Sequence, residues 1–150
     1  MTAPATRLAD IMTRTVLAIT PESTLEEAHD LMRGAKIHHL VVMKVGRVAG
    51  ILSERDLVRA RAAQYRTGDD AWTVEELMSS RVVVASPEMT VQDAARMLRG
   101  HAVGCLPVVD GKQLVGIVTV SDLLDLLARI HVARSEPLEQ QISESARIGC

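Results

Sequence analysis

An internal repeat constrains the fold of this chain more than any other feature of its sequence. When Pro21 is placed on Pro87, a shift of 66 residues (87 − 21), residues 8–60 align with residues 74–126 without a gap. Identical pairs recur along the whole alignment, among them Met12 with Met78, Gly50 with Gly116 and Asp56 with Asp122. Most other pairs exchange one aliphatic side chain for another. The chain is therefore predicted to contain two copies of one supersecondary unit.

Each copy reads as strand, helix, strand, strand, helix. Short apolar runs at 16–19 and 82–85 predict the first strands, and Thr24 and Thr90 begin helices with capping-box spacing. Gly34 is expected to be the left-handed residue that ends its helix, and so is Gly100. Two further pairs of apolar runs predict hairpins, at 40–43 with 48–52 and at 106–109 with 114–118. The last helices are expected to begin near Ser53 and Thr119.

One such unit leaves a face of its sheet uncovered, which predicts how the two copies pack. We expect an α/β (α+β) fold in which two βαββα repeats pack sheet to sheet about a pseudo-two-fold axis, with two symmetric clefts between them. The expected parts are repeat one at 7–60, a linker at 61–73, repeat two at 74–130 and a polar C-terminal tail at 131–150. The tail is expected to be loosely ordered or to pack on a partner. Tyr65 and Trp72 either cover the seam between repeats or contact a partner.

Composition excludes several classes of function. A net charge of −2 and 1% aromatic residues argue against nucleic-acid binding. No apolar run approaches the roughly 20 residues of a membrane span, and residues 1–10 do not resemble a signal peptide. Cys105 and Cys150 do not form a disulfide framework, so a cytoplasmic setting is expected. The five histidines lack metal-ligand spacing, and no Walker loop or Gly-x-Ser-x-Gly occurs, so we expect neither a metal, a cofactor nor an enzyme.

The sequence Ser/Thr-x-x-Asp occurs twice where a strand is expected to run directly into a helix, at Ser53–Asp56 and at Thr119–Asp122. Free backbone N–H groups and the helix dipole make such a helix start a natural seat for phosphate. A carboxylate one turn later can accept hydrogen bonds from a ribose diol. The alternative is an ordinary capping box, in which the carboxylate binds the backbone of its own helix start.

These motifs resemble those of the CBS-domain family, named after cystathionine β-synthase. The resemblance covers about residues 7–130 and rests on Gly50–Leu57, Gly116–Leu123 and the Leu-Pro-Val-Val-Asp stretch at 106–110. The first copy departs from it at Val41, where the proline usually stands. The resemblance implies stand-alone tandem CBS repeats that bind an adenine nucleotide, AMP, ADP or ATP, with phosphate at Ser53 or Thr119 and ribose at Asp56 or Asp122.

The resemblance also implies where the rest of the nucleotide lies. The adenine is expected between residues that begin the first two strands of each repeat; these are Thr15, Val16, Ile37 and His38 in repeat one and Arg81, Val82, Val103 and Gly104 in repeat two. The valines of this set are also expected in the core. Similar proteins often carry His or Arg at this point, facing the phosphates. Of His38 and His39 only one can face a given cleft, because neighbouring strand residues point to opposite sides. Arg55 stands where the second motif has Ser121, so the first cleft is expected to be the stronger phosphate site.

Two functions stay open at this point. The first is a regulatory module that binds the nucleotide and signals to an unidentified partner protein. The second is a dimerisation or regulatory scaffold that binds no ligand. In both cases we expect a homodimer, because the Leu-rich last helix and the helix at 25–32 offer more apolar surface than one repeat pair can bury.

Overall fold

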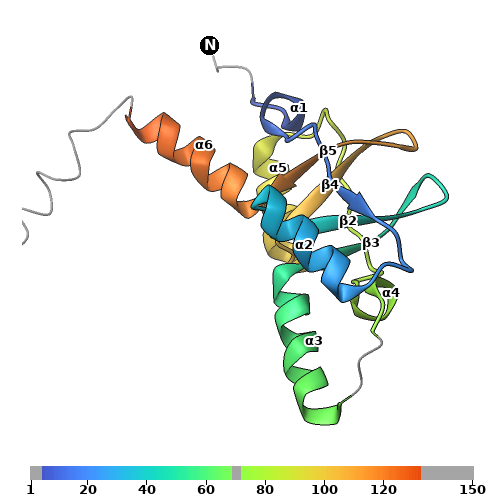
Figure 1. Cartoon of the computed structure of the whole chain (residues 1–150). Coiled ribbons are helices and arrows are strands. Elements are labelled where there is room, and N and C mark those ends of the chain that lie inside the picture. The colour runs from blue at the N-terminus through green and yellow to red at the C-terminus, as the bar shows by residue number, and fades with distance from the viewer. Residues whose placement is uncertain (1–4, 69–71, 133–150) are drawn as a thin grey trace, which may run out of the picture.

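The computed structural model describes residues 5–68 and 72–132 (Figure 1). Repeat one contains the helices α2 (Leu25–Ala35) and α3 (Glu54–Thr67) and the strands β1 (Ala18–Ile19), β2 (His39–Lys44) and β3 (Arg47–Ser53). Repeat two contains α5 (Val91–His101), β4 (Cys105–Asp110), β5 (Gln113–Thr119) and α6 (Val120–Val132). Each repeat begins with a one-turn helix, α1 (Leu8–Ile11) in repeat one and α4 (Val74–Leu77) in repeat two. The predicted mixed α+β architecture of two matching units is confirmed.

The two sheets differ in their first strands. In repeat one β1 runs parallel to β2, which pairs antiparallel with β3. In repeat two β4 and β5 form the same antiparallel hairpin, but the strand predicted at 82–85 is reduced to a single bridge between Ala85 and Val108. The prediction for 16–19 was also too long, since only Ala18 and Ile19 pair with β2. The segments 16–19 and 82–85 each form few hydrogen bonds to a neighbouring strand, because the rest of each segment crosses between the two repeats.

The left-handed residues that end α2 and α5 are Lys36 and Ala102, with φ of 55° and 53°. The prediction that Gly34 and Gly100 hold these positions was wrong, since both glycines lie inside their helices. The packing of Ile37 against the first core decides where α2 ends. The Ile37 N–H donates to the Met32 carbonyl at 3.0 Å, a Schellman arrangement, and both side chains join the first core.

Helix α3 continues to Thr67 and ends at Gly68, so it takes up much of the segment predicted as a linker. Trp72 packs against the first core, whereas the Tyr65 side chain is 94% exposed and covers no seam. Residues 69–71 and the segment 133–150, which contains nearly all of the predicted tail, lie outside the described residues.

The two repeats exchange their short leading helices. Val74 of α4 is buried in the core of repeat one, and Leu8 of α1 is buried in the core of repeat two. The contacts are reciprocal: the Leu8 N–H donates to the Met89 carbonyl and the Val74 N–H to the Ser23 carbonyl, both at 2.9 Å. Each core is therefore completed by a segment from the other half of the module.

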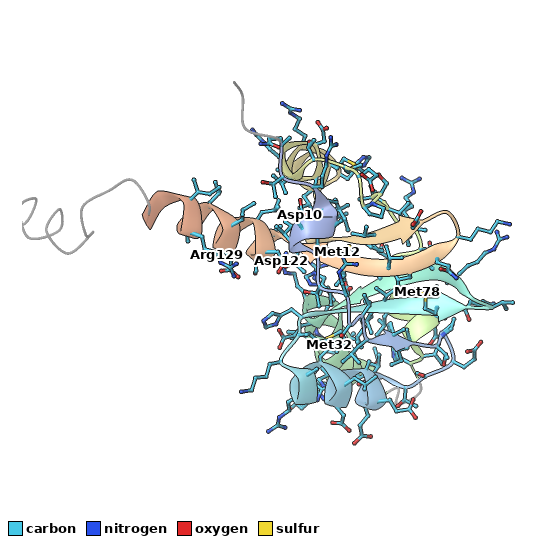
Figure 2. All side chains as sticks on the ribbon, turned by 90° about the horizontal axis from the view of Figure 1, so that it is seen from above. Asp10, Met12, Met32, Met78, Asp122 and Arg129 are labelled. Carbon is cyan, nitrogen blue, oxygen red and sulfur yellow. The ribbon has the colours of Figure 1, made fainter. Side chains whose placement is uncertain are left out.

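The seam between the hairpins repeats this symmetry. Thr13 bridges to Ile117 of β5, and Ser79 bridges to Ile51 of β3. Met12 and Met78, labelled in Figure 2, lie against Gly116 and Gly50, where a Cβ atom would come within 2.5 Å of the methionine sulfur. Glycine leaves the space that each methionine fills, which explains why both members of the pair are identical in the two repeats. The expected pseudo-two-fold pairing is thus present down to single contacts.

Candidate functional site

The first candidate site lies where β3 runs directly into α3. Ser53 is the N-cap of α3, and its hydroxyl accepts the Asp56 N–H at 3.2 Å. The Asp56 carboxylate oxygen Oδ2 accepts the Ser53 N–H and the Ser53 hydroxyl, both at 2.8 Å. We call Ser53, Arg55 and Asp56 the first seat.

The second seat, formed by Thr119, Ser121 and Asp122, repeats this geometry at the start of α6. Asp122 Oδ2 accepts the Thr119 N–H at 2.7 Å, and Thr119 Oγ1 accepts the Asp122 N–H at 3.3 Å. The Arg55 and Ser121 side chains are exposed in their first turns, while the two aspartates are half-buried.

Both seats are capping boxes, as the alternative interpretation expected. The capping bonds involve Oδ2, one of the two oxygens of each carboxylate. A capping role and a ligand role are compatible, because the box holds the carboxylate at the open end of the helix. The box also fixes the hydroxyl of Ser53 or Thr119 beside the helix start.

The two adjacent histidines point in different directions. His38 is 71% exposed in its side chain, and its Nδ1 lies 2.6 Å from the Glu54 carboxylate in the first turn of α3. His39 opens β2, pairs in register with Ser53 and is half-buried. The histidine turned toward the first seat is therefore His39.

The pKa of His39 lies below its ordinary value of 6.5. Burial is the main cause because it disfavours the charged imidazolium, and the neighbouring His38 and Arg55 lower the pKa further. The negative charge of Asp56 acts in the opposite direction and raises the pKa of His39. The imidazole of the free protein is accordingly neutral at pH 7.

His39 also contacts the other repeat. A Cβ atom built on Gly104 would lie 2.8 Å from His39 Nε2, so the ring occupies the space next to the Gly104 backbone. The Gly104 carbonyl accepts the N–H of Val120, the first residue of α6, at 3.1 Å. In repeat one the corresponding bond runs from Glu54 to the His38 carbonyl at 2.8 Å.

The segments predicted to hold the adenine cross between the repeats. Thr15 and Val16 follow Thr13, which bridges to β5, and precede β1, which pairs with β2. Arg81 and Val82 connect the bridge at Ser79 on β3 to the bridge at Ala85 on β4. These segments therefore span both hairpins, although no described contact joins them to either seat.

The expectation that the adenine valines also serve the core holds for Val103, which packs against the second core. Ile37 packs against the first core. Val16 and Val82 are half-buried.

Two surface hollows lie beside α2 and α3. One of about 570 Å³ is lined by Thr24, Leu25, Glu26, Arg61, Gln64, Trp72 and Thr73. The other, of about 320 Å³, is lined by His29, Met32, Arg33, Lys36, Ile37, His38, Glu54 and Leu57. Of the predicted site residues, Ile37 and His38 line the smaller hollow. Sequence reasoning passed over Glu54 as a partner of His38, although its place one residue after the N-cap could have indicated it.

The second repeat has Cys105 where the first has His39. Burial raises the pKa of the Cys105 thiol to about 12, so the thiol stays protonated. Among the side chains that the structure describes, no group of three or more His, Cys, Asp or Glu residues could hold a metal ion. None of the helices in 5–68 and 72–132 is both long and apolar enough to span a bilayer.

Comparison with known proteins identifies the family of the two repeats. The CBS domain model matches the chain twice, at residues 8–63 and 74–129. The CBS domain-containing protein YhcV of Bacillus subtilis is 36% identical over 114 residues, which cover 76% of this chain and 80% of YhcV. The magnesium transporter MgtE of Thermus thermophilus is 36% identical over 124 residues, or 26% of the transporter.

Solved structures show the same fold. The CBS domain pair of protein MJ0100, in complex with 5′-methylthioadenosine and S-adenosyl-L-methionine, superposes with a TM-score of 0.75 at 27% identity. The match covers 83% of this chain and 98% of that pair. The cytosolic domain of the Mg²⁺ channel MgtE in complex with ATP gives a TM-score of 0.66 at 33% identity, covering 80% of this chain and 48% of that domain. With two matched CBS domains that exchange their leading helices, the chain belongs to the CBS-domain family and forms a regulatory CBS pair.

Proposed function

We propose that this CBS pair binds an adenine nucleotide, AMP, ADP or ATP, between its repeats and passes its occupancy to a partner protein. The observation that carries the proposal is the duplicated seat: a hydroxyl and a carboxylate held by reciprocal bonds at the start of α3, and again at the start of α6. In each seat the dipole of the helix start attracts phosphate, and the carboxylate oxygen that takes no part in the capping bonds can bind a ribose diol.

The solved relatives support the chemical class of the ligand. S-adenosyl-L-methionine and 5′-methylthioadenosine in the MJ0100 pair and ATP in the MgtE domain share an adenosine group. In the present chain the crossing segments at Thr15–Val16 and Arg81–Val82 would hold the adenine, with Ile37 and Val103 at the edge of the core. The first seat contains Arg55 and lies next to His39, so we assign the phosphates of ATP to it.

A thermal shift series with AMP, ADP, ATP and S-adenosyl-L-methionine tests this function. A ligand present at 100 times its dissociation constant should stabilise the protein by about 2.7 kcal/mol. Mass spectrometry of small molecules released from the purified protein identifies a ligand that is retained. If none of the four compounds changes the melting temperature and none is released, the alternative of a ligand-free dimerisation scaffold is favoured.

We propose that the module acts in the cytoplasm, as a homodimer and without catalysis of its own, and that its output reaches another protein. Turnover of ATP by the purified chain at saturating nucleotide would contradict the non-catalytic part.

A further inference from the structure

The imidazole of His39 lies at the meeting point of the two repeats. On one side His39 pairs in register with Ser53 of the first seat. On the other side its Nε2 fills the space that a side chain on Gly104 would need. The carbonyl of Gly104 in turn receives the first N–H of α6, the helix that carries the second seat. The ring therefore adjoins the backbone that leads into both helix starts.

This arrangement has no counterpart in the other half of the module, because the equivalent residues there are different. The position equivalent to His39 holds Cys105, whose buried thiol is too short to mirror the ring and carries no charge. The position equivalent to Gly104 holds His38, whose ring is engaged with Glu54 at 2.6 Å. One imidazole thus stands where a symmetric module would have two or none.

The charges that surround the His39 ring in the free protein do not suffice to protonate it. His38 and Arg55 disfavour the imidazolium, Asp56 favours it, and Gly104 contributes backbone alone. Because burial keeps the ring neutral, a phosphate brought beside it is the added negative charge that can reverse this balance. The imidazole then takes a proton from solvent and gains a charge-assisted hydrogen bond to the phosphate.

We infer that His39 serves both seats, so that a phosphate-bearing ligand in either half of the module draws on the same imidazole. The inference rests on the nucleotide function proposed above and extends it: the two seats are linked through one residue, and Gly104 is the glycine that lets the ring reach the second. A single proton is then taken up on His39 per chain, whichever seat is filled.

Titration calorimetry with ATP at pH values from 5.5 to 8 tests the inference on the full chain. The Asp56→Asn variant impairs the first seat, so that binding to the second dominates. In this background His39→Gln should weaken ATP binding roughly tenfold at the acidic end and reduce its pH dependence. Gly104→Ala in the same background should act like His39→Gln, because its Cβ displaces the ring.

Two control variants match these changes. His101→Gln removes an exposed imidazole at the end of α5, and Gly100→Ala adds a methyl group where no atom lies within 4 Å. Both should leave ATP binding and its pH dependence unchanged. Proton uptake on His39, measured in buffers of different ionisation enthalpy, should persist in both controls and be lost in His39→Gln and in Gly104→Ala.

The outcomes separate this inference from the nucleotide function itself. If Asp56→Asn binds ATP equally well with and without His39, the shared role is overturned while nucleotide binding stands. Loss of all ATP binding in Asp56→Asn, when the wild-type protein binds ATP, would also overturn it, because the second seat then takes no ligand. Absence of ATP and AMP binding in the wild-type protein would remove both proposals.

Discussion

At the scale of single residues, the buried imidazole of His39 makes the free protein sensitive to acid. Its pKa in the folded state is lowered by burial, whereas an unfolded imidazole titrates near ~6.5. As pH falls below that value the unfolded chain binds more protons than the folded one, so stability is lost toward the folded pKa and is fully present above ~6.5.

We expect His39→Gln to flatten the pH dependence of the free energy of unfolding between pH 7.5 and 5.5. Urea unfolding of the ligand-free protein at several pH values measures it. The exposed imidazole of His101 supplies the comparison, since His101→Gln should keep the wild-type slope. An unchanged slope in His39→Gln would contradict the prediction.

The two aspartates of the seats allow capping and ligand binding to be separated. Asp56→Asn and Asp122→Asn keep an oxygen that can accept the N-cap N–H but lose the charge. Each should therefore melt close to the wild type, yet bind nucleotide less tightly in its own seat by roughly 1.5–3 kcal/mol, the value of a charge-assisted hydrogen bond.

The alanine variants complete this comparison. Asp56→Ala and Asp122→Ala remove the cap as well and should melt earlier than the asparagine variants. If the alanine variants melt early but bind nucleotide normally in calorimetry, the carboxylates are helix caps and nothing more.

At the scale of the elements, the ends of α2 and α5 offer a stability test. Gly34 lies inside α2 with open space around it, while Lys36 holds the left-handed conformation that glycine prefers. Gly34→Ala should therefore raise the free energy of unfolding by roughly 0.5–1 kcal/mol, and Lys36→Gly should raise it by up to about 1 kcal/mol. Urea unfolding measures both.

Gly50→Ala is the opposite case. Its Cβ would meet the Met78 sulfur at 2.5 Å, so the same substitution should cost roughly 1–3 kcal/mol. Equal changes in the free energy of unfolding for Gly34→Ala and Gly50→Ala would contradict both the gain in helix propensity expected at Gly34 and the steric clash expected at Gly50.

These helix ends also show what the sequence could and could not predict. The capping boxes at Thr24, Ser53 and Thr119 followed from local spacing, because the residues that make the bonds lie three positions apart. The end of α2 did not, because it is set by Ile37 reaching the core of the sheet, a contact that no local pattern contains. A glycine two residues earlier was the more visible signal, and it was misleading.

At the scale of the whole molecule, the 66-residue repeat was enough to predict two units and their pseudo-two-fold pairing. It could not predict that α1 and α4 change places, since a repeat fixes which residues are equivalent but not which copy they pack against. The contact between His39 and Gly104 was beyond sequence reasoning for the same reason. It joins non-equivalent positions of the two copies across the seam.

The surfaces of α3 and α6 differ in a way that bears on assembly. Four large apolar side chains of α6 are exposed along one stripe, Val120, Leu124, Leu127 and Ile130. The equivalent positions of α3 hold Glu54, Val58, Arg61 and Gln64. Figures 1 and 2 show α6 extending away from the body, with Asp122 at its base and Arg129 farther out. The proposed homodimer should therefore form through α6 in preference to α3, because the α6 stripe contains no charged residue to desolvate.

Two matched substitutions test this preference. Leu124 and Val58 are equivalent in the repeat and similarly exposed, at 58% and 62%. Leu124→Glu places a charge in the α6 stripe and should convert the dimer to a monomer, whereas Val58→Glu should leave the dimer intact. Light scattering from low to high micromolar concentration measures the mass of each variant and of the wild type. A dimer disrupted equally by both substitutions would mean that α3 shares the interface, and a monomeric wild type at the highest concentration would exclude the homodimer altogether.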